Sequence, residues 1–215
     1  MNPNCSNNKC LLSPRLLYMS FVVGAVLILL AIIINNEKSS EFLASSVSFQ
    51  NGDLVFMRGR TWRSWFVRFI DDVDDFSHVG IVRFVNGVPN VIHAAPEAEV
   101  VQLESIGDFL SHSDTDNVGI YRLINGQLFA DEASLEAWNY FVRGTSFDHK
   151  FDILRDETLY CTELVWRAYV NAGIDLSEGE EDFLYDAIIY GKVLLPKRLS
   201  MCRRLAKIVQ DGSWE

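Results

Sequence analysis

Residues 159–166, LYCTELVW, decide how this chain folds, because they place Cys161 in the first turn of an apolar helical pattern. One helical face carries side chains at i, i+3, i+4 and i+7: Cys161, Leu164, Val165 and Ala168. The pattern ends at Gly173, since glycine is typical of the position just after a helix. A thiol in a first helical turn lies near unbonded backbone amides and the positive end of the helix dipole, which favour its thiolate. Cys161 is therefore a candidate nucleophile.

Two histidine-bearing strands precede this helix. Residues 76–82, FSHVGIV, and residues 91–95, VIHAA, are short runs rich in β-branched side chains. The Asn-Gly pair at 86–87 between them is a strong hairpin signal. Side chains alternate along a strand, so the faces that carry His78 and His93 can coincide, although the sequence does not fix the register. The predicted hairpin thus offers two imidazoles to the candidate thiol.

The rest of the domain predicts a mixture of strands and helices. Further strands are expected at 54–57, 99–103 and 118–123, and helices at 62–69, 131–143, 185–189 and 197–209. The acidic stretch 71–75 lacks the glycine and terminal glutamate of an EF-hand loop, so we interpret it as a solvated loop. The pattern as a whole predicts an α+β fold.

A long apolar segment lies near the N-terminus. Residues 16–34 form 19 consecutive positions without a charged side chain. At about 1.5 Å per residue, a helix of this length spans roughly 28 Å, close to the thickness of a bilayer's hydrocarbon core. A cleaved signal peptide is the main alternative, but its apolar core is shorter, about 7–15 residues, and ends at a small-x-small site. We therefore expect a retained transmembrane helix.

These features divide the chain into four expected parts. They are a short N-terminal segment at 1–15, a transmembrane signal anchor at 16–34, a serine-rich linker at 35–48 and a single folded domain at 49–215. Lys9 and Arg15 precede the apolar segment and no acidic residue does, which favours a cytoplasmic N-terminus. The folded domain is then expected in the periplasm or outside the cell.

The expected exported part is strongly acidic. All 29 acidic residues follow residue 36, together with 17 of the 19 basic ones, since only Lys9 and Arg15 precede it; the net charge of this part is therefore −12. Such a charge argues against binding to nucleic acid and against electrostatic docking on anionic lipid headgroups. The membrane attachment is left to the anchor.

The cysteines leave one alternative open. Cys161 and Cys202 both lie in the expected exported part, and in an oxidising compartment they could form a disulfide that removes the catalytic thiol. No spacing typical of metal ligands, such as C-x-x-C, and no internal repeat occurs. We therefore expect neither a metal nor an organic cofactor.

Thiol hydrolysis needs a thiolate, an imidazole that moves the proton and a polar group that orients the imidazole. Cys161, His78 and His93 can fill these roles in that order. Each residue alone has a simpler interpretation, because a strand histidine is usually a hydrogen-bonded core residue and a buried cysteine is usually inert. Their combination on two strands and a helix favours a cysteine hydrolase.

The ordered motifs resemble a known family. Four stretches occur in sequence: 52–55 (GDLV), 76–82 (FSHVGIV), 91–96 (VIHAAP) and 160–165 (YCTELV). They are similar to the permuted branch of the NlpC/P60 papain-like superfamily, most of all to YaeF/YiiX-type amidases, over about residues 49–173. In that branch the histidine strand comes before the cysteine helix. The resemblance implies a circularly permuted papain-like fold, with an antiparallel sheet packed against the cysteine helix, and thiol amidase activity.

The resemblance also implies a role for each residue. Cys161 matches the nucleophile and His78 the general base, which later acts as the acid. The third polar position falls on His93, where YiiX-like sequences often have glutamate. A neutral imidazole orients His78 less strongly than a carboxylate does and cannot offset its positive charge, so Glu97 and Glu163 are candidates to compensate.

Two interpretations of Tyr160 stay open. Its hydroxyl could stabilise a developing oxyanion beside the Cys161 amide, or its ring could simply pack in the core.

Three functions also stay open. The leading one is a membrane-anchored cysteine hydrolase that cleaves a peptide or cell-envelope amide through an acyl-enzyme at Cys161. The second is lipid acyl hydrolysis or transfer, because lecithin:retinol acyltransferase-like proteins share the permuted order and often have a second histidine in a motif similar to residues 91–94. The third is a non-catalytic exported binding module. The expected partners are a small peptide, amide or lipid-linked substrate and the membrane, and the sequence does not indicate an oligomeric state.

Overall fold

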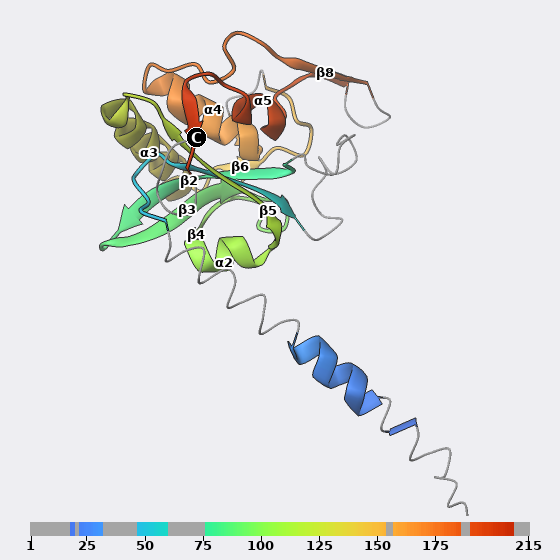
Figure 1. The fold of residues 1–215 in the computed structure, drawn as a ribbon. Helices are drawn as coiled ribbons and strands as arrows, with labels where there is room; N and C mark the ends of the chain where they lie inside the picture. Colours follow the sequence, from blue (N-terminus) through green and yellow to red (C-terminus); the bar gives the residue numbers. More distant parts are fainter. Residues whose placement is uncertain are drawn as a thin grey trace, which may run out of the picture. The chain divides into compact units, whose positions relative to one another are not determined.

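The structure is a computed structural model that describes residues 18–19, 22–31, 47–59, 76–153, 157–185 and 190–208 (Figure 1). The chain divides into two compact units, Met1–Lys38 and Ser39–Glu215. The expected helix at 62–69, the acidic stretch 71–75 and the N-terminal segment 1–15 lie outside the described residues. The expected linker is described only from residue 47 onward.

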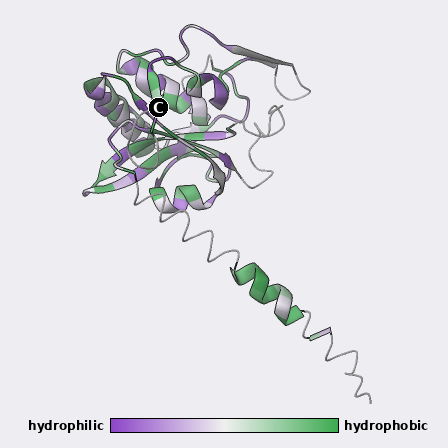
Figure 2. Cartoon of the chain, viewed as in Figure 1, coloured by the Kyte–Doolittle hydropathy of each residue, from purple (hydrophilic) through white to green (hydrophobic). Residues whose placement is uncertain are grey.

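The first unit is described over a short helical stretch. Residues 22–31 are helical, and Figure 2 shows them as hydrophobic. Among the described residues, no helix is long and apolar enough to cross a bilayer. The expected span at 16–34 extends beyond the described stretch at both ends, so the transmembrane helix stays a prediction.

The second unit is built on one antiparallel sheet of six strands in the order β10-β5-β1-β2-β3-β4. Their bounds are β1 Leu54–Gly59, β2 His78–Val85, β3 Val88–Ala94, β4 Val101–Ser105, β5 Ser113–Leu123 and β10 Leu205–Lys207. Two small ribbons accompany it: β6 Ser146–Phe147 pairs in parallel with β7 Thr158–Leu159, and β8 Asp182–Tyr185 pairs antiparallel with β9 Tyr190–Val193.

The predicted hairpin is confirmed. Strands β2 and β3 pair antiparallel from Val85↔Val88 to Ile81↔Ile92. Asn86 and Gly87 between them both have positive φ, 53° and 80°, as a two-residue type I′ turn requires. This turn fixes the register that the sequence left open.

Two hydrophobic cores cover the two faces of the sheet. Helix α3 (Gln127–Val142) and helix α4 (Cys161–Asn171) lie on one face, and helix α2 (Ile106–Ser111) lies on the other (Figure 1). Val79 and Ile81 of β2 belong to the core beneath α3 and α4, whereas Val82 belongs to the core beneath α2. The alternation along β2 therefore assigns His78 and Gly80 to the α2 face.

The cysteine helix is confirmed in position and length. It runs from Cys161 to Asn171, and its C-cap Ala172 is followed by Gly173 at φ 94°. This left-handed residue ends the helix as the sequence predicted. The expected helix at 131–143 is also confirmed, although it begins earlier, at Gln127.

The C-terminal part differs from the expected closing helix at 197–209. The structure has a five-residue helix, α5 (Pro196–Ser200), followed by strand β10. Leu205 is buried and pairs with Leu123, so the tail adds an edge strand to the sheet. The expected helix at 185–189 is also not supported at its start, because Tyr185 ends strand β8; residues 186–189 lie outside the described part.

Candidate active site

Cys161 lies at the first position of α4. Its N-cap neighbour Tyr160 has extended backbone angles, φ −98° and ψ 171°, which turn the chain from β7 into the helix. The cysteine is 3% exposed, and its sulfur lies 3.6 Å from Thr162 Oγ1. The backbone amides of Val79, Thr162 and Cys161 itself lie close enough to the sulfur to favour its thiolate.

The thiol nevertheless does not rest as a thiolate. Burial raises the pKa of Cys161 to about 11, against the opposing effects of the Thr162 hydroxyl and the nearby amides. The sequence led us to expect a favoured thiolate, because helix termini stabilise negative charge. That expectation is wrong for the resting site, because burial destabilises the thiolate by more than the nearby amides and the helix dipole stabilise it.

His78 and His93 meet side by side, as the hairpin predicted. His78 Nε2 lies 2.9 Å from His93 Nδ1, and the ring centroids are 5.1 Å apart in an edge-to-face arrangement. Phe109 of α2 packs against both rings, with centroid distances of 5.6 Å to His78 and 4.9 Å to His93. The two imidazoles are therefore fixed in orientation by each other and by one aromatic wall.

His78 is a neutral imidazole at neutral pH. Although its side chain keeps some contact with solvent, the dense protein around it lowers its pKa well below 6.5, and the nearby His93 and His112 act in the same direction. A neutral imidazole is the form that can accept a proton from a thiol.

The Cys161 sulfur lies beside β2, near the backbone amide of Val79. Residues His78–Gly80 pair with β1, and His93 and Ala94 pair with β4, but the ladder between β2 and β3 begins only at Ile81↔Ile92. The Val82 amide donates to the backbone carbonyl of Asp53, just before β1, at 2.8 Å, and amides alternate along a strand, so the Val79 amide points toward β3. The sulfur near that amide therefore lies on the side of β2 that faces β3, beyond the last pair of the ladder, Ile81↔Ile92.

The sulfur is therefore close to the backbone of the residue that follows His78. His78 Nε2 is bonded to His93, which leaves Nδ1 as the other ring nitrogen of His78. Among the described residues, no hydrogen bond yet joins the Cys161 sulfur to the His78 ring. Catalytic hydrogen bonds are often long in the absence of substrate and tighten when it binds.

Glu104 of β4 is a site residue that the sequence reasoning missed. Its Oε2 lies 3.5 Å from His93 Nε2 and 3.5 Å from His112 Nε2. Gln102 is opposite His93 in the β3–β4 register, so Glu104, two residues on, shares its face of the sheet. We expected this strand to end at residue 103; a strand extended by one or two residues would have placed the carboxylate beside His93.

Tyr160 makes the contacts of a packing residue. Its ring is fully buried and packs 5.4 Å from the Phe151 ring, and its hydroxyl accepts a hydrogen bond from the Leu194 amide at 2.9 Å. This contact gives no support to an oxyanion role for the Tyr160 hydroxyl.

The two carboxylates expected to compensate for His93 lie elsewhere. Glu163 is fully buried and bonded to Arg167 at 2.8 Å, and Arg167 in turn donates to the Ile153 carbonyl. Burial raises the pKa of Glu163 to about 8 despite the Arg167 guanidinium. Glu97 is exposed in the turn after β3. Neither is the carboxylate that contacts the histidine pair.

The alternative of a disulfide is wrong. Cys161 and Cys202 are both free and buried in the structure. The thiol that a hydrolase needs is therefore intact.

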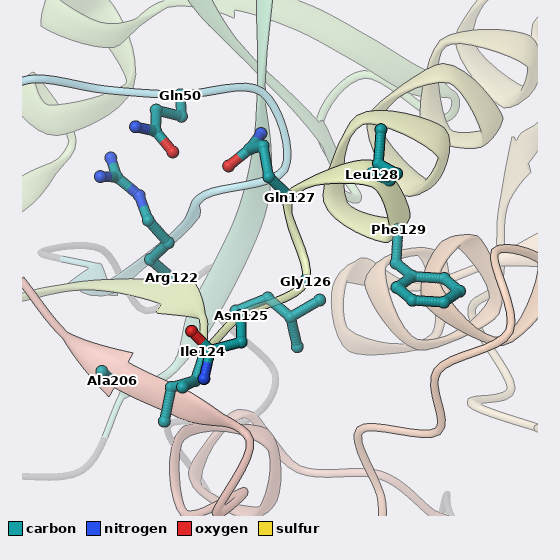
Figure 3. A pocket seen from close by; sticks show the side chains of 10 residues that line it. Gln50, Arg122, Ile124, Asn125, Gly126, Gln127, Leu128, Phe129 and Ala206 are labelled. Carbon is teal, nitrogen blue, oxygen red and sulfur yellow. The ribbon is translucent and has the colours of Figure 1, made fainter.

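A separate hollow of about 740 Å³ lies at the junction of β5, α3 and β10 (Figure 3). Its lining includes Arg122, Ile124, Leu128 and Phe129. None of the residues around Cys161 and His78 contributes to it, so this hollow is not the catalytic cleft.

Comparison with known families assigns the chain to a group. A family model described as permuted papain-like amidase enzyme, YaeF/YiiX, C92 family, matches residues 48–208. The chain belongs to this family. The resemblance predicted from the four sequence motifs is confirmed, and so is the α+β architecture of an antiparallel sheet packed against the cysteine helix. Permuted papain-like amidases are, as a family, cysteine hydrolases.

Relatives of this permuted papain-like amidase occur in Escherichia coli. The uncharacterized protein YiiX of strain K12 is 25% identical over 135 residues, which cover 63% of this chain and 64% of that protein. The chain thus matches just under two thirds of that relative's length.

A crystal structure described as metalloprotein YiiX from strain O157:H7 matches the fold with a TM-score of 0.62 and 22% identity, covering 77% of this chain and 98% of that one. The description as a metalloprotein concerns the E. coli protein. Within the described part of the present chain, no group of three His, Cys, Asp or Glu side chains is placed to hold a metal ion.

Proposed function

We propose that this permuted papain-like amidase is a membrane-anchored cysteine hydrolase that cleaves an amide bond through an acyl-enzyme at Cys161. The single observation that carries the proposal is the 2.9 Å contact from His78 Nε2 to His93 Nδ1, one residue from the Val79 amide that lies beside the Cys161 sulfur. With Nε2 engaged, the second nitrogen of His78 is left for the thiol. A thiol, a base and an orienting group are the three parts of papain-type chemistry.

In the acylation half, a neutral thiol reacts with help from a neutral imidazole. His78 Nδ1 takes the proton from Cys161 as the sulfur attacks the carbonyl carbon of the amide, giving a tetrahedral oxyanion. His78 then delivers this proton to the amide nitrogen, the C–N bond breaks, and the amine leaves with the acyl group bound as a thioester. Amides at the α4 N-terminus are available for the oxyanion.

In the deacylation half, water takes the place of the amine. His78 removes a proton from the water, which attacks the thioester carbonyl, and the C–S bond then breaks. The leaving sulfur regains the proton from His78, so the carboxylic acid product departs and the neutral pair is restored.

The membrane part of the proposal concerns residues 16–34. This stretch has no charged side chain, and its described central part, 22–31, is helical and hydrophobic. We propose a signal anchor with a cytoplasmic N-terminus and the catalytic domain in the periplasm or outside the cell. Protease added to right-side-out membrane vesicles should then digest the domain, whereas the domain should survive in inside-out vesicles. Protection in right-side-out vesicles would reverse the orientation.

The catalytic part is tested by trapping the acyl-enzyme. The full chain in detergent is incubated with a short peptide aryl ester, and intact-protein mass spectrometry measures the acyl adduct. Wild type and Cys202→Ala should both gain one acyl group, Cys161→Ala should gain none, and His78→Gln should react roughly 10²–10⁴ times more slowly. Equal labelling of wild type and Cys161→Ala would remove the proposal.

The second candidate, lipid acyl hydrolysis or transfer, is favoured by one observation. His93, the second histidine shared with lecithin:retinol acyltransferase-like proteins, contacts His78 directly. If the chain hydrolyses phospholipid vesicles and not cell-wall peptides, with the same dependence on Cys161 and His78, this second candidate is favoured.

A further inference from the structure

Four ionisable side chains form a row that leads from the catalytic base to solvent. His78 Nε2 contacts His93 Nδ1 at 2.9 Å, His93 Nε2 lies 3.5 Å from Glu104 Oε2, and His112 Nε2 lies 3.5 Å from the same oxygen. His93 is 3% exposed, the Glu104 side chain is 22% exposed and the His112 side chain 60%. The row crosses β2, β3, β4 and the C-cap of α2.

In the inner part of this row, the donor and the acceptor of each contact can be assigned, which gives the row a direction. An ionised carboxylate only accepts hydrogen bonds, so the His93 nitrogen that faces Glu104, Nε2, has to carry the proton. When Nε2 holds the only ring proton of His93, Nδ1 is an acceptor, and the proton of the 2.9 Å contact then belongs to His78 Nε2. A neutral His78 protonated at Nε2 has its lone pair at Nδ1, the nitrogen that the proposed acylation step requires.

Glu104 is suited to impose this direction. Its pKa lies below the usual range, chiefly because His93 donates toward it, so it is ionised at neutral pH. His93 and His112 are the ionisable groups that face it. Within the described residues, neither His93 Nε2 nor Glu104 Oε2 has a well-formed hydrogen bond, and this Glu104 oxygen is equally far from His93 Nε2 and from His112 Nε2.

We propose that Glu104 is the positioning residue of the catalytic site, fixing the protonation of His93 and, through it, of His78, so that His78 Nδ1 is free to accept the Cys161 proton. This inference rests on the proposed function and deepens it. Glu104 supplies the carboxylate that is absent at position 93. It acts on His78 through the His93 ring, so it lies further from the thiol than a glutamate at position 93 would. Glu104 also offsets the positive charge that His78 acquires when it takes the proton.

The 3.5 Å distance between His93 Nε2 and Glu104 Oε2 is too long for a strong hydrogen bond in the resting site. A well-formed N–H···O bond to a carboxylate is about 2.7–2.9 Å long, so the resting contact is mainly electrostatic. A shift of less than about 1 Å in the Glu104 side chain closes it. His112 contacts the same oxygen from the solvent side and is not needed for the direction of the row, which makes it a matched control.

The first test needs no substrate. Ring ¹⁵N–¹H correlation spectra of the full chain in detergent at pH 8 report which nitrogen of each histidine is protonated. Wild type and His112→Gln should show His78 and His93 as Nε2–H forms, and Glu104→Gln should show a mixture at both rings. His78 protonated at Nδ1 in wild type would overturn the inference without any variant.

The second test is the rate of acylation by the peptide aryl ester. Glu104→Gln should lower kcat roughly 10–100-fold with KM nearly unchanged, because an orienting partner has been lost and no substrate contact has. His112→Gln should stay within about twofold of wild type. A Glu104→Gln variant that keeps the wild-type rate and tautomers would overturn the inference.

The two tests separate this inference from the proposed function. If wild type forms no acyl-enzyme, the proposed function fails, and the spectra still decide whether Glu104 sets the tautomers. If wild type reacts and Glu104→Gln reacts equally well, the hydrolase stands and the role of Glu104 falls.

Discussion

A thiol whose pKa is about 11, next to an imidazole whose pKa lies well below 6.5, rests as a neutral pair. Cys161 therefore differs from a cysteine held as a thiolate by a nearby positive charge. The proton has to move when substrate arrives, and this makes the orientation of His78 more important than the resting charge of the sulfur. The close His78–His93 contact provides that orientation.

The pH dependence of acylation follows from the form of His78. The base must be neutral, and burial lowers its pKa, so protonation sets in only well below pH 6.5. We expect the rate with the peptide aryl ester to stay level from pH 7.5 down past pH 6.5 and to fall in more acidic buffer. A decline centred at pH 6.5 or above, with the protein still folded by circular dichroism, would contradict this.

Glu163 predicts that the folded chain loses stability as the pH rises, whereas the acylation rate is expected to fall as the pH drops. Its pKa is about 8 in the folded chain and 4.5 in its ordinary state, so the folded form prefers the protonated acid. The stability due to this preference is complete below pH 4.5 and is lost as the pH rises through 8. The free energy of unfolding of wild type should therefore fall relative to Glu163→Gln between pH 5 and 9. Parallel curves for the two proteins would show that Glu163 is ionised throughout.

At the scale of secondary structure, the site depends on the β2–β3 hairpin and on where its strands separate. The sequence predicted the hairpin, the two histidines on it and the start and end of the cysteine helix, because an Asn-Gly turn and an apolar i, i+3, i+4 pattern are local signals. It did not predict Glu104 as a partner of His93. That contact depends on the register between β3 and β4, which no local signal sets.

Gly80 shows how closely the two histidine strands approach each other. A Cβ at this position would lie 2.2 Å from Val91 Cγ1 and 3.2 Å from His93 Cβ. Gly80→Ala should destabilise the fold by about 1–3 kcal/mol, measured by chemical denaturation, and should slow acylation by displacing His93.

Gly107→Ala is the matched control for that substitution. A Cβ at Gly107 would meet only Ser105 Oγ at 3.9 Å, so this variant should be as stable as wild type or up to about 1 kcal/mol more stable. Equal stability of both variants would show that Gly80 is not tightly packed.

At the scale of the whole molecule, the sheet holds its strands together by buried pairing as well as by apolar cores. Asp53, the residue before β1, is 1% exposed and receives two hydrogen bonds of 2.7 Å from Arg122 of β5. The tail was the largest departure from the predicted fold. The basic segment has leucines at intervals that favour a helix locally. In the structure, however, Leu205 is buried and its strand pairs with β5, which stabilises the extended form.

Breaking this buried pair should cost far more than breaking an exposed one. Arg122→Met leaves the Asp53 carboxylate buried without its cation and should cost about 3–5 kcal/mol. Arg203→Met removes an ion pair to Glu178 in which the arginine side chain is 87% exposed, and it should cost less than about 1 kcal/mol. Thermal and urea unfolding of both variants measures the difference, and similar losses would contradict the account.

The central claim is that the thiol at the start of α4 and the imidazole of β2 form one catalytic pair. It is tested most directly by the distance between Cys161 Sγ and His78 Nδ1 in a crystal structure of the chain. The account predicts about 3–4 Å, with His78 Nε2 still bonded to His93. A sulfur more than about 6 Å from the ring, or one facing Nε2 in place of Nδ1, would contradict it.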